Sequence, residues 1–216
     1  MGVTDPPEGG RRRLSGAARR AAIVEAAARL FAEQGFSGST REIAARLGVT
    51  QALLYRYFPS KEALVGAVFE AYRTTWDESR AALLVGPAPL AERVLAFYAA
   101  YLLRDTGYNR ARLFMHAALA GIDLPLRYSP DLDAKVLRPV LAALRAEVGL
   151  AAPGPKLGRD ERDLVLNLHG AIVFVGIRRH VYGAVMSDER HMELVGGIIC
   201  IYLPGALAWL KLSCGN

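Results

Sequence analysis

The amino-acid sequence predicts an all-α protein, with an N-terminal three-helix unit followed by a larger helical domain. Apolar residues recur at helical spacing nearly throughout the 216 residues, and no stretch combines strand-like alternation with hairpin turns. Because 52% of the residues are apolar, the chain can also bury a substantial core.

The first two predicted helices are separated by glycines. Four apolar residues share one face of the first helix: Ile23, Ala27, Leu30 and Phe31. Gly35 suits a C-terminal cap for this helix. The second helix begins at Ser39, where the pattern STRE predicts a capping box: the Ser39 hydroxyl accepts from the amide of Glu42, and the Glu42 carboxylate reaches back. Gly48 ends this helix after barely two turns.

The third and fourth predicted helices follow at once. Thr50 suits the N-cap of the third helix, and Pro59 ends it. Its inward anchors are Val49, Leu54 and Phe58. Ser60 caps a longer fourth helix, to about residue 78, which we expect to connect the N-terminal unit to the rest as a lever. Its apolar stripe is Leu64, Val65, Val68, Phe69 and Tyr72.

Glycine, proline and aspartate clusters divide the rest of the chain into five further helical stretches. The breaks are VGPAP at 85–89, DTG at 105–107, GIDLP at 121–125, GLAAPGPKLG at 149–158 and GAVMSD at 183–188.

Positive charge is concentrated near the N-terminus. The segment from Arg11 to Lys61 holds ten of the 27 basic residues and three acidic ones, a net charge of +7, while the remaining 17 basic and 18 acidic residues give −1. This asymmetry favours a polyanionic partner, either nucleic acid or an anionic membrane surface. A solvated basic surface is the alternative.

The sequence offers little for metal or cofactor chemistry. Cys200 and Cys214 are too few for a disulfide scaffold or a zinc site, and no CxxC or HExxH spacing accompanies them. We therefore expect no metal, no cofactor and a reducing cytoplasm. No apolar run follows the charges of residues 1–17, so this segment is predicted to be a disordered basic arm rather than a secretory signal.

Residues 194–210 imitate a membrane span, because they are uncharged and approach the ~17 to 25 residues that a span requires. Pro204 interrupts the segment, and no polybasic flank sets an orientation. We expect a helix buried in an interface and no membrane association.

The third helix exposes side chains typical of DNA readout. Gln51 can bond a base edge, Arg56 can bond guanine O6 and N7, and Ala52 or Leu53 can contact a thymine methyl group. A short helix, a glycine corner and an exposed polar helix together predict a helix-turn-helix, with the third helix in the major groove. The predicted DNA-binding residues, which include phosphate contacts, are Ser39, Thr40, Arg41, Thr50, Gln51, Ala52, Leu53, Tyr55, Arg56, Tyr57 and Lys61.

Each of these residues also has a structural alternative. Tyr55 and Tyr57 could cover the edge of the domain, and Leu53 could pack against the fourth helix.

Residues 35–64, GFSGSTREIAARLGVTQALLYRYFPSKEAL, resemble the DNA-binding signature of the TetR (tetracycline-repressor-like) family of transcription regulators. The matching elements are G-F, the T-R-E-I-A helix, G-V-T, L-Y-x-Y-F and S-K-E-x-L. The resemblance implies a homodimer with a DNA-binding domain over residues 18–62 and an effector-binding and dimerisation domain over residues 63–216. It also implies a ligand-responsive regulator, expected to be a repressor, that is released from a near-palindromic operator by a small effector.

Aromatic and polar side chains on the apolar helices of residues 90–182 are candidates for the effector site. They are Phe97, Tyr98, Tyr101, Phe114, His116, Asn167, His169 and Phe174. Few charges interrupt these faces, so an apolar or aromatic effector is expected. Each histidine can equally be a satisfied core residue.

Residues 164–177 and 194–210 are apolar on more faces than one core can use. Glycines 170, 176, 196 and 197 would let helices approach closely. We expect a homodimer through these last two helices, arranged as a two-fold four-helix interface.

Two other functions stay open. The chain could bind DNA without a ligand or as an activator. More distantly, the C-terminal helices could form an enzyme, but GFSGS falls short of the GxSxG elbow and no strand precedes it.

Overall fold

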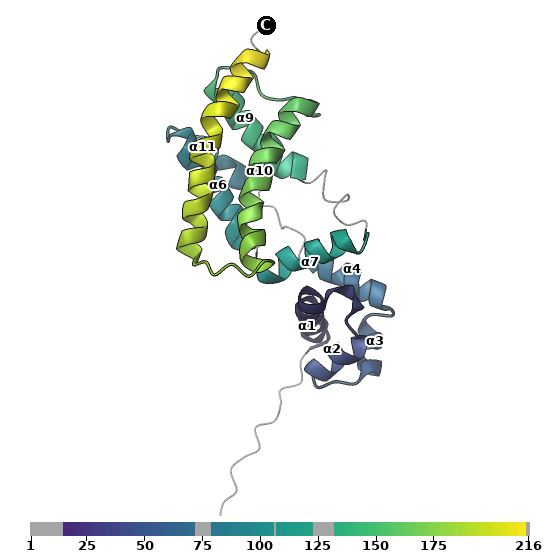
Figure 1. Cartoon of the computed structure of the whole chain (residues 1–216). Coiled ribbons are helices and arrows are strands. Elements are labelled where there is room, and N and C mark those ends of the chain that lie inside the picture. Colours follow the sequence, from purple (N-terminus) through teal and green to yellow (C-terminus); the bar gives the residue numbers. More distant parts are fainter. Residues whose placement is uncertain (1–14, 72–78, 106, 123–131, 215–216) are drawn as a thin grey trace, which may run out of the picture.

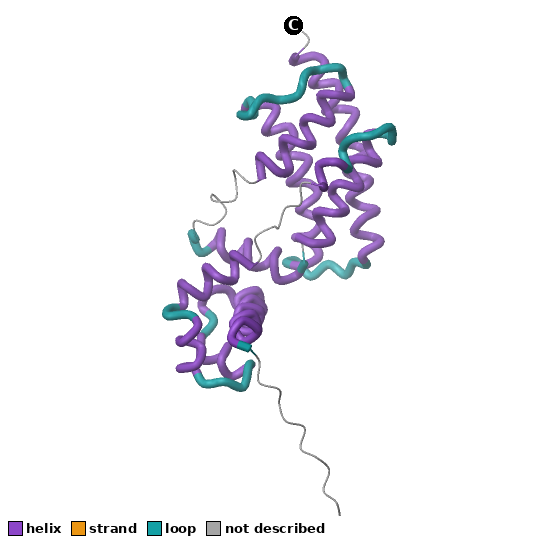
Figure 2. The backbone as a smooth tube through the Cα atoms, turned by 180° about the vertical axis from the view of Figure 1, so that it is seen from behind, coloured by secondary structure: helices purple, strands orange, loops and turns teal. Residues whose placement is uncertain are grey.

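The computed structural model describes residues 15–71, 79–105, 107–122 and 132–214, and these ranges contain helices and loops but no strand (Figure 2). The all-α prediction is confirmed. The helices are α1 (Gly16–Gln34), η1 (Gly35–Ser37), α2 (Thr40–Arg46), α3 (Gln51–Tyr57), α4 (Lys61–Ala71), α5 (Ser79–Ala82), α6 (Leu90–Asp105), α7 (Tyr108–Leu119), η2 (Asp133–Leu137), α9 (Arg138–Glu147), α10 (Arg159–His180) and α11 (Asp188–Cys214).

The predicted basic arm lies outside the described residues up to position 14. Its last three residues are helical or cap a helix, which corrects that part of the prediction: Ser15 accepts a hydrogen bond from the amide of Ala18 at 3.2 Å, and Gly16 begins α1. The predicted end of the fourth helix, residues 72–78, also lies outside the described residues.

Helices α1 to α4 form an N-terminal lobe around one apolar core (Figure 1). The inward faces predicted from the sequence are confirmed, and the fully covered side chains include Ile23, Ala27, Leu30, Phe31, Ile43, Leu54 and Leu64. Gly35 ends α1 with φ 72°, a backbone conformation that favours glycine, and its amide bonds the carbonyl of Phe31.

The caps of the short helices are mostly as predicted. Thr50 accepts from the amide of Leu53 at 3.2 Å, and Ser60 accepts from the amide of Ala63 at 3.1 Å. The capping box at Ser39 is wrong in detail, because the Ser39 hydroxyl accepts from the amide of Arg41 at 3.1 Å. The carboxylate of Glu42 instead accepts from Gln34 and Arg46, since those longer donors reach it from the ends of α1 and α2.

Helices α6, α9, α10 and α11 form the C-terminal lobe, in which α10 and α11 lie side by side in front of α6 and α9 (Figure 1). Tyr202 on α11 donates to the carbonyl of Leu164 on α10 at 2.7 Å. The prediction that Pro204 interrupts the last helix is wrong, because α11 continues through it. Pro204 lies on the exposed face of α11, away from the helices that pack against it.

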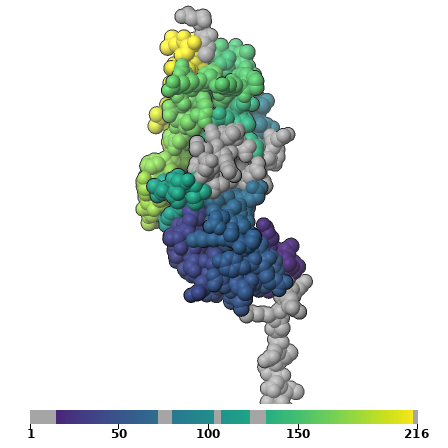
Figure 3. Space-filling view, turned by 90° about the vertical axis from the view of Figure 1, so that its right-hand side faces the viewer, coloured from purple at the N-terminus to yellow at the C-terminus, as the bar shows by residue number. Residues whose placement is uncertain are grey.

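Helix α7 lies between the two lobes, where its teal side chains meet the N-terminal lobe (Figure 3). Leu113 and Ala117 of α7 are fully covered within the core of the N-terminal lobe. A helix from the second half of the chain is therefore part of the packing that holds α1 in place.

Candidate functional site

Helix α3 is too short to be stable alone, so its position depends on the lobe beneath it. Leu54 and Phe58 are its buried anchors, at 0% and 2% exposure, and the guanidinium of Arg20 lies 4.8 Å above the Phe58 ring. The opposite face carries Ala52, Tyr55 and Arg56, which are exposed. The predicted inward anchors and the exposure of Ala52, Tyr55 and Arg56 are confirmed, whereas Gln51, Leu53 and Tyr57 are half-buried rather than fully exposed.

Thr40 links the starts of α2 and α3. The Gln51 side chain donates from Nε2 to Thr40 Oγ1 at 2.9 Å, and the Tyr55 hydroxyl lies 3.3 Å from the same oxygen. Thr40 itself is only 7% exposed. The predicted phosphate contact of Thr40 stays a prediction, and the structure shows that its hydroxyl contacts the side chains of Gln51 and Tyr55 on α3.

The other predicted DNA-binding residues differ in exposure. Arg41 and Thr50 are exposed, as is Ser39, whereas Leu53 and Lys61 are half-buried. Tyr57 packs against the core of the N-terminal lobe, as the alternative interpretation expected.

Arg46, at the end of α2, is exposed but is paired with acidic side chains of α1 and α2. Its guanidinium bonds Glu33 at 2.8 Å and Glu42 at 3.0 Å, and Gln34 also donates to Glu42 at 3.1 Å. The hydrogen bond from Arg46 lowers the pKa of Glu33. This network fixes the angle between α1 and α2 with groups that remain solvent-exposed.

Four of the eight predicted effector residues meet inside the C-terminal lobe. The ring of His169 on α10 lies 5.9 Å from the Tyr98 ring and 5.4 Å from the Tyr101 ring, both on α6. Tyr98 is fully covered and His169 is 7% exposed. Phe97 contacts Tyr98 edge-on at 5.4 Å and is buried in the same core.

Two polar atoms of this aromatic group are buried without a hydrogen-bond partner among the described residues: the Tyr98 hydroxyl and His169 Nδ1. Burial lowers the pKa of His169 to about 4 and raises that of Tyr98, so both groups are uncharged at neutral pH. Buried polar atoms are costly unless they are bonded, so these two suit a ligand or water with its own polar group.

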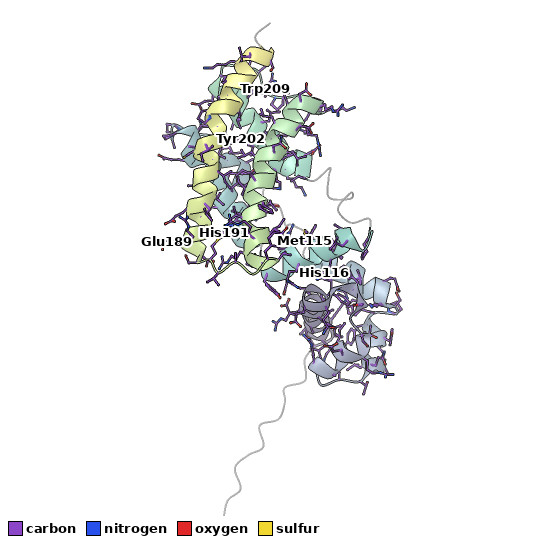
Figure 4. All side chains as sticks on the ribbon, in the orientation of Figure 1. Met115, His116, Glu189, His191, Tyr202 and Trp209 are labelled. Atoms are coloured by element: carbon purple, nitrogen blue, oxygen red, sulfur yellow. The ribbon has the colours of Figure 1, made fainter. Side chains whose placement is uncertain are left out.

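The other four predicted effector residues lie elsewhere. Phe114 and His116 are on α7 at the junction of the lobes, where Phe114 contacts the Phe69 ring edge-on and His116 lies over Gly35 (Figure 4). Asn167 and Phe174 are exposed on α10. Inward-facing residues recur every three to four positions on these helices, and these four residues lie between them. The face on which each of the four lies could therefore not be assigned without knowing which neighbours pack on α10 and α7.

The described part of the chain contains cavities that could hold a small molecule. A mostly apolar one of ≈480 Å³ lies between α5, α9 and the loop after α9, with Arg93 and Arg138 in its lining. A smaller one of ≈220 Å³ lies where α6, α7, α10 and α11 meet. Neither has any of the eight predicted effector residues in its described lining.

Sequence reasoning missed Arg112 on α7. Its Nε donates to the carbonyl of Ala32 on α1 at 2.6 Å, and its Nη1 lies 3.5 Å from the carbonyl of His180 on α10. An arginine on a helix surface gives no signal in the sequence for such contacts, because both acceptors are backbone atoms far along the chain.

Comparison with known proteins shows what this chain is similar to. A family model described as "Bacterial regulatory proteins, tetR family" matches residues 23–68. An HTH-type transcriptional repressor of Mycobacterium tuberculosis is 36% identical over 139 residues, which cover 62% of this chain and 73% of the repressor. The HTH-type transcriptional regulator RutR of Escherichia coli (strain K12) is 37% identical over 117 residues, 53% of this chain and 55% of RutR.

Solved structures share the fold. A TetR-like transcriptional regulator from Rhodococcus sp. RHA1 superposes with a TM-score of 0.62 at 20% identity, covering 89% of this chain and 100% of that one. A ketosteroid transcriptional regulator of Mycobacterium tuberculosis superposes with a TM-score of 0.61 at 20% identity, covering 88% of this chain and 96% of that one. The arrangement of an N-terminal lobe and a larger helical lobe is therefore common to these proteins.

Proposed function

Since the chain belongs to the TetR family of bacterial regulatory proteins, we propose that it regulates transcription as a DNA-binding repressor that releases its operator when it binds a small effector. It is a regulator rather than an enzyme. DNA binding is assigned to residues 18–62, and effector binding and dimerisation to residues 63–216. The expected location is the cytoplasm, on the nucleoid when DNA is bound.

The observation that carries this proposal is the outward face of α3. Ala52, Tyr55 and Arg56 are exposed on a helix whose other side is anchored by Leu54 and Phe58. A helix held this rigidly can enter the major groove without rearranging, and Arg56 has the fork of donors that matches guanine O6 and N7.

The dimer is proposed to form through the exposed faces of α10 and α11. Between positions 197 and 208 of α11 the exposed residues are apolar or small, and Ile201 is 84% exposed. By length and composition alone, Asp188–Ser213 is the helix of the described residues that could cross a membrane. Only 28% of its apolar stretch is buried within one chain. A second copy of the chain would cover this face.

The glycines support close packing of two copies. A Cβ added at Gly170 or Gly197 would meet no atom within 4 Å, so both positions face open space in one chain. Asn167 and Phe174, which were candidates for the effector site, lie on the same exposed face of α10 as Gly170 and fit a dimer interface better.

The effector is proposed to bind beside Tyr98, Tyr101 and His169. The side chains packed there are aromatic and aliphatic, and the unbonded Tyr98 hydroxyl and His169 Nδ1 would bond one polar group of a ligand that enters this core. An uncharged, mostly apolar effector fits this site, because neither polar side chain carries a charge at neutral pH.

Selection of bound duplexes from a random pool by the purified protein tests this function. The expected product is a near-palindrome whose half-sites match two recognition helices of a dimer. Apolar aromatic compounds are then tested for release of the selected duplex. Failure to enrich any sequence would contradict specific DNA binding, and enrichment without release by any compound would favour the ligand-independent alternative.

A further inference from the structure

The smaller cavity, ≈220 Å³, is separate from the Tyr98 and His169 group. It lies at the end of the C-terminal lobe that faces α7, where the last turn of α10 meets the first turn of α11 (Figure 4). Its lining among the described residues is Leu102, Gly107, Arg179, His180, Asp188, His191 and Met192. The volume is below the roughly 300 to 1,000 Å³ of pockets for drug-sized ligands, so a ligand here is small.

His191 is the buried polar group of this cavity. The residue is 5% exposed, and its Nε2 has no hydrogen-bond partner among the described residues. A buried imidazole nitrogen left unbonded is unfavourable, and a ligand oxygen in the cavity would satisfy it.

The charges around His191 favour an anionic ligand. Arg179 is 26% exposed and is paired with Asp188, whose carboxylate is 86% exposed and lies on the solvent side. Burial lowers the pKa of His191, and the charge of Arg179 lowers it further, by more than Asp188 raises it. Among the described groups, the positive charge of Arg179 therefore contributes more to the potential at the imidazole than the negative charge of Asp188.

The helix ends add to this potential. The positive end of the α11 dipole lies at this cavity, since α11 begins at Asp188. Two of the opposing carbonyls at the end of α10 already have protein donors: Ile177 accepts from the amide of Val181, and His180 faces Arg112.

We propose that this cavity binds a small carboxylate with a short apolar or aromatic body. The carboxylate would bond His191 Nε2 and compete with the exposed Asp188 for Arg179, while Leu102 and Met192 would contact the apolar part. Among the described residues no group of three or more His, Cys, Asp or Glu side chains could share a metal ion, so the donor set does not match a metal site.

Benzoate is the probe for the test. The chain has four histidines, at positions 116, 169, 180 and 191, whose ring carbon signals can be followed separately in a ¹³C-histidine-labelled full-length protein. Benzoate is expected to shift the His180 and His191 signals saturably and to leave His169 unchanged. Benzyl alcohol, which lacks the charge, is expected to bind at least tenfold more weakly, and so is inorganic phosphate, which lacks the apolar body.

Two arginine variants provide the matched pair. Arg179→Ala is expected to weaken benzoate binding at least tenfold. Arg178→Ala removes the same charge from an exposed neighbour and is expected to change benzoate binding less than twofold. The proposal is overturned if benzoate at a concentration on the order of 20 mM shifts no histidine signal, or if it shifts the His169 signal as much as the His191 signal. It is also overturned if phosphate binds more tightly than benzoate. No DNA is needed, so the outcome is independent of the proposed regulatory function.

Discussion

The Nε of Arg112 donates a hydrogen bond to the carbonyl oxygen of Ala32, 2.6 Å away, and so joins α7 to the last turn of α1. Ala32 is among the last four residues of its helix, whose carbonyls have no partner within the helix. The same guanidinium lies 3.5 Å from the carbonyl of His180 at the end of α10. One side chain thus contacts the terminal carbonyls of a helix in each lobe.

Replacing Arg112 by Ala is expected to lower the free energy of unfolding by about 1 to 3 kcal/mol, because a charged donor is lost and the Ala32 carbonyl is left without it. Urea denaturation measures this change. Arg178→Ala is the control, since Arg178 is exposed. Equal stability of the two variants would mean that the Arg112 contacts contribute nothing to joining the lobes.

Arg56 and Lys61 are expected to differ in their effect on DNA. Arg56→Ala should weaken binding to the selected operator by about 1 to 3 kcal/mol and leave random duplexes less affected, because Arg56 is exposed on α3. Lys61→Ala should weaken all duplexes alike and reduce the salt dependence. Fluorescence anisotropy at several salt concentrations checks both. Equal losses on operator and random DNA for both variants would contradict this division.

Thr40→Val tests whether Thr40 orients α3 or binds phosphate. Valine keeps the shape of a residue that is 7% exposed but removes the oxygen that bonds Gln51 and lies beside Tyr55. If Thr40 orients these residues, operator affinity falls by about 1 kcal/mol while affinity for random DNA is unchanged. A parallel loss on both duplexes would instead identify Thr40 as a phosphate contact.

The N-terminal lobe could be predicted closely from the sequence because its signals are local. Thr50 and Ser60 cap the helices that follow them, and Leu54 and Phe58 are buried as their spacing indicates. Each of these contacts joins residues a few positions apart, or anchors set by one helical period.

The effector region could be predicted only in part. Tyr98 and His169 meet as expected, but Asn167 is exposed on the same helix as His169, two positions away. A helix that is apolar on several faces has no single periodic stripe, so its orientation depends on which helices pack against it. The position of Arg112 against Ala32 depends in the same way on how the lobes meet.

The dimer interface predicts a specific response to charge on α11. Ile201→Glu should convert the dimer to a monomer at micromolar concentration in sedimentation velocity, because a carboxylate would be buried against an apolar face. Val185→Glu is the matched control, since Val185 is fully exposed in the loop before α11. A dimer that persists in Ile201→Glu would place the interface elsewhere.

Stability is expected to fall in mild acid because of His169. Burial lowers its pKa to about 4, whereas an unfolded histidine titrates near 6.5, so the unfolded state binds more protons between these values. The stability that neutral His169 provides is therefore complete above pH 6.5 and is lost as the pH falls toward 4, by about 2 kcal/mol between pH 7 and pH 5. Urea denaturation across this range measures the loss. His169→Phe keeps a ring against Tyr98 and Tyr101 without a titrating group, so its stability should change less with pH than that of the wild type. Parallel curves for the two proteins would contradict the prediction, because they would show that His169 has the same pKa in the folded and unfolded states.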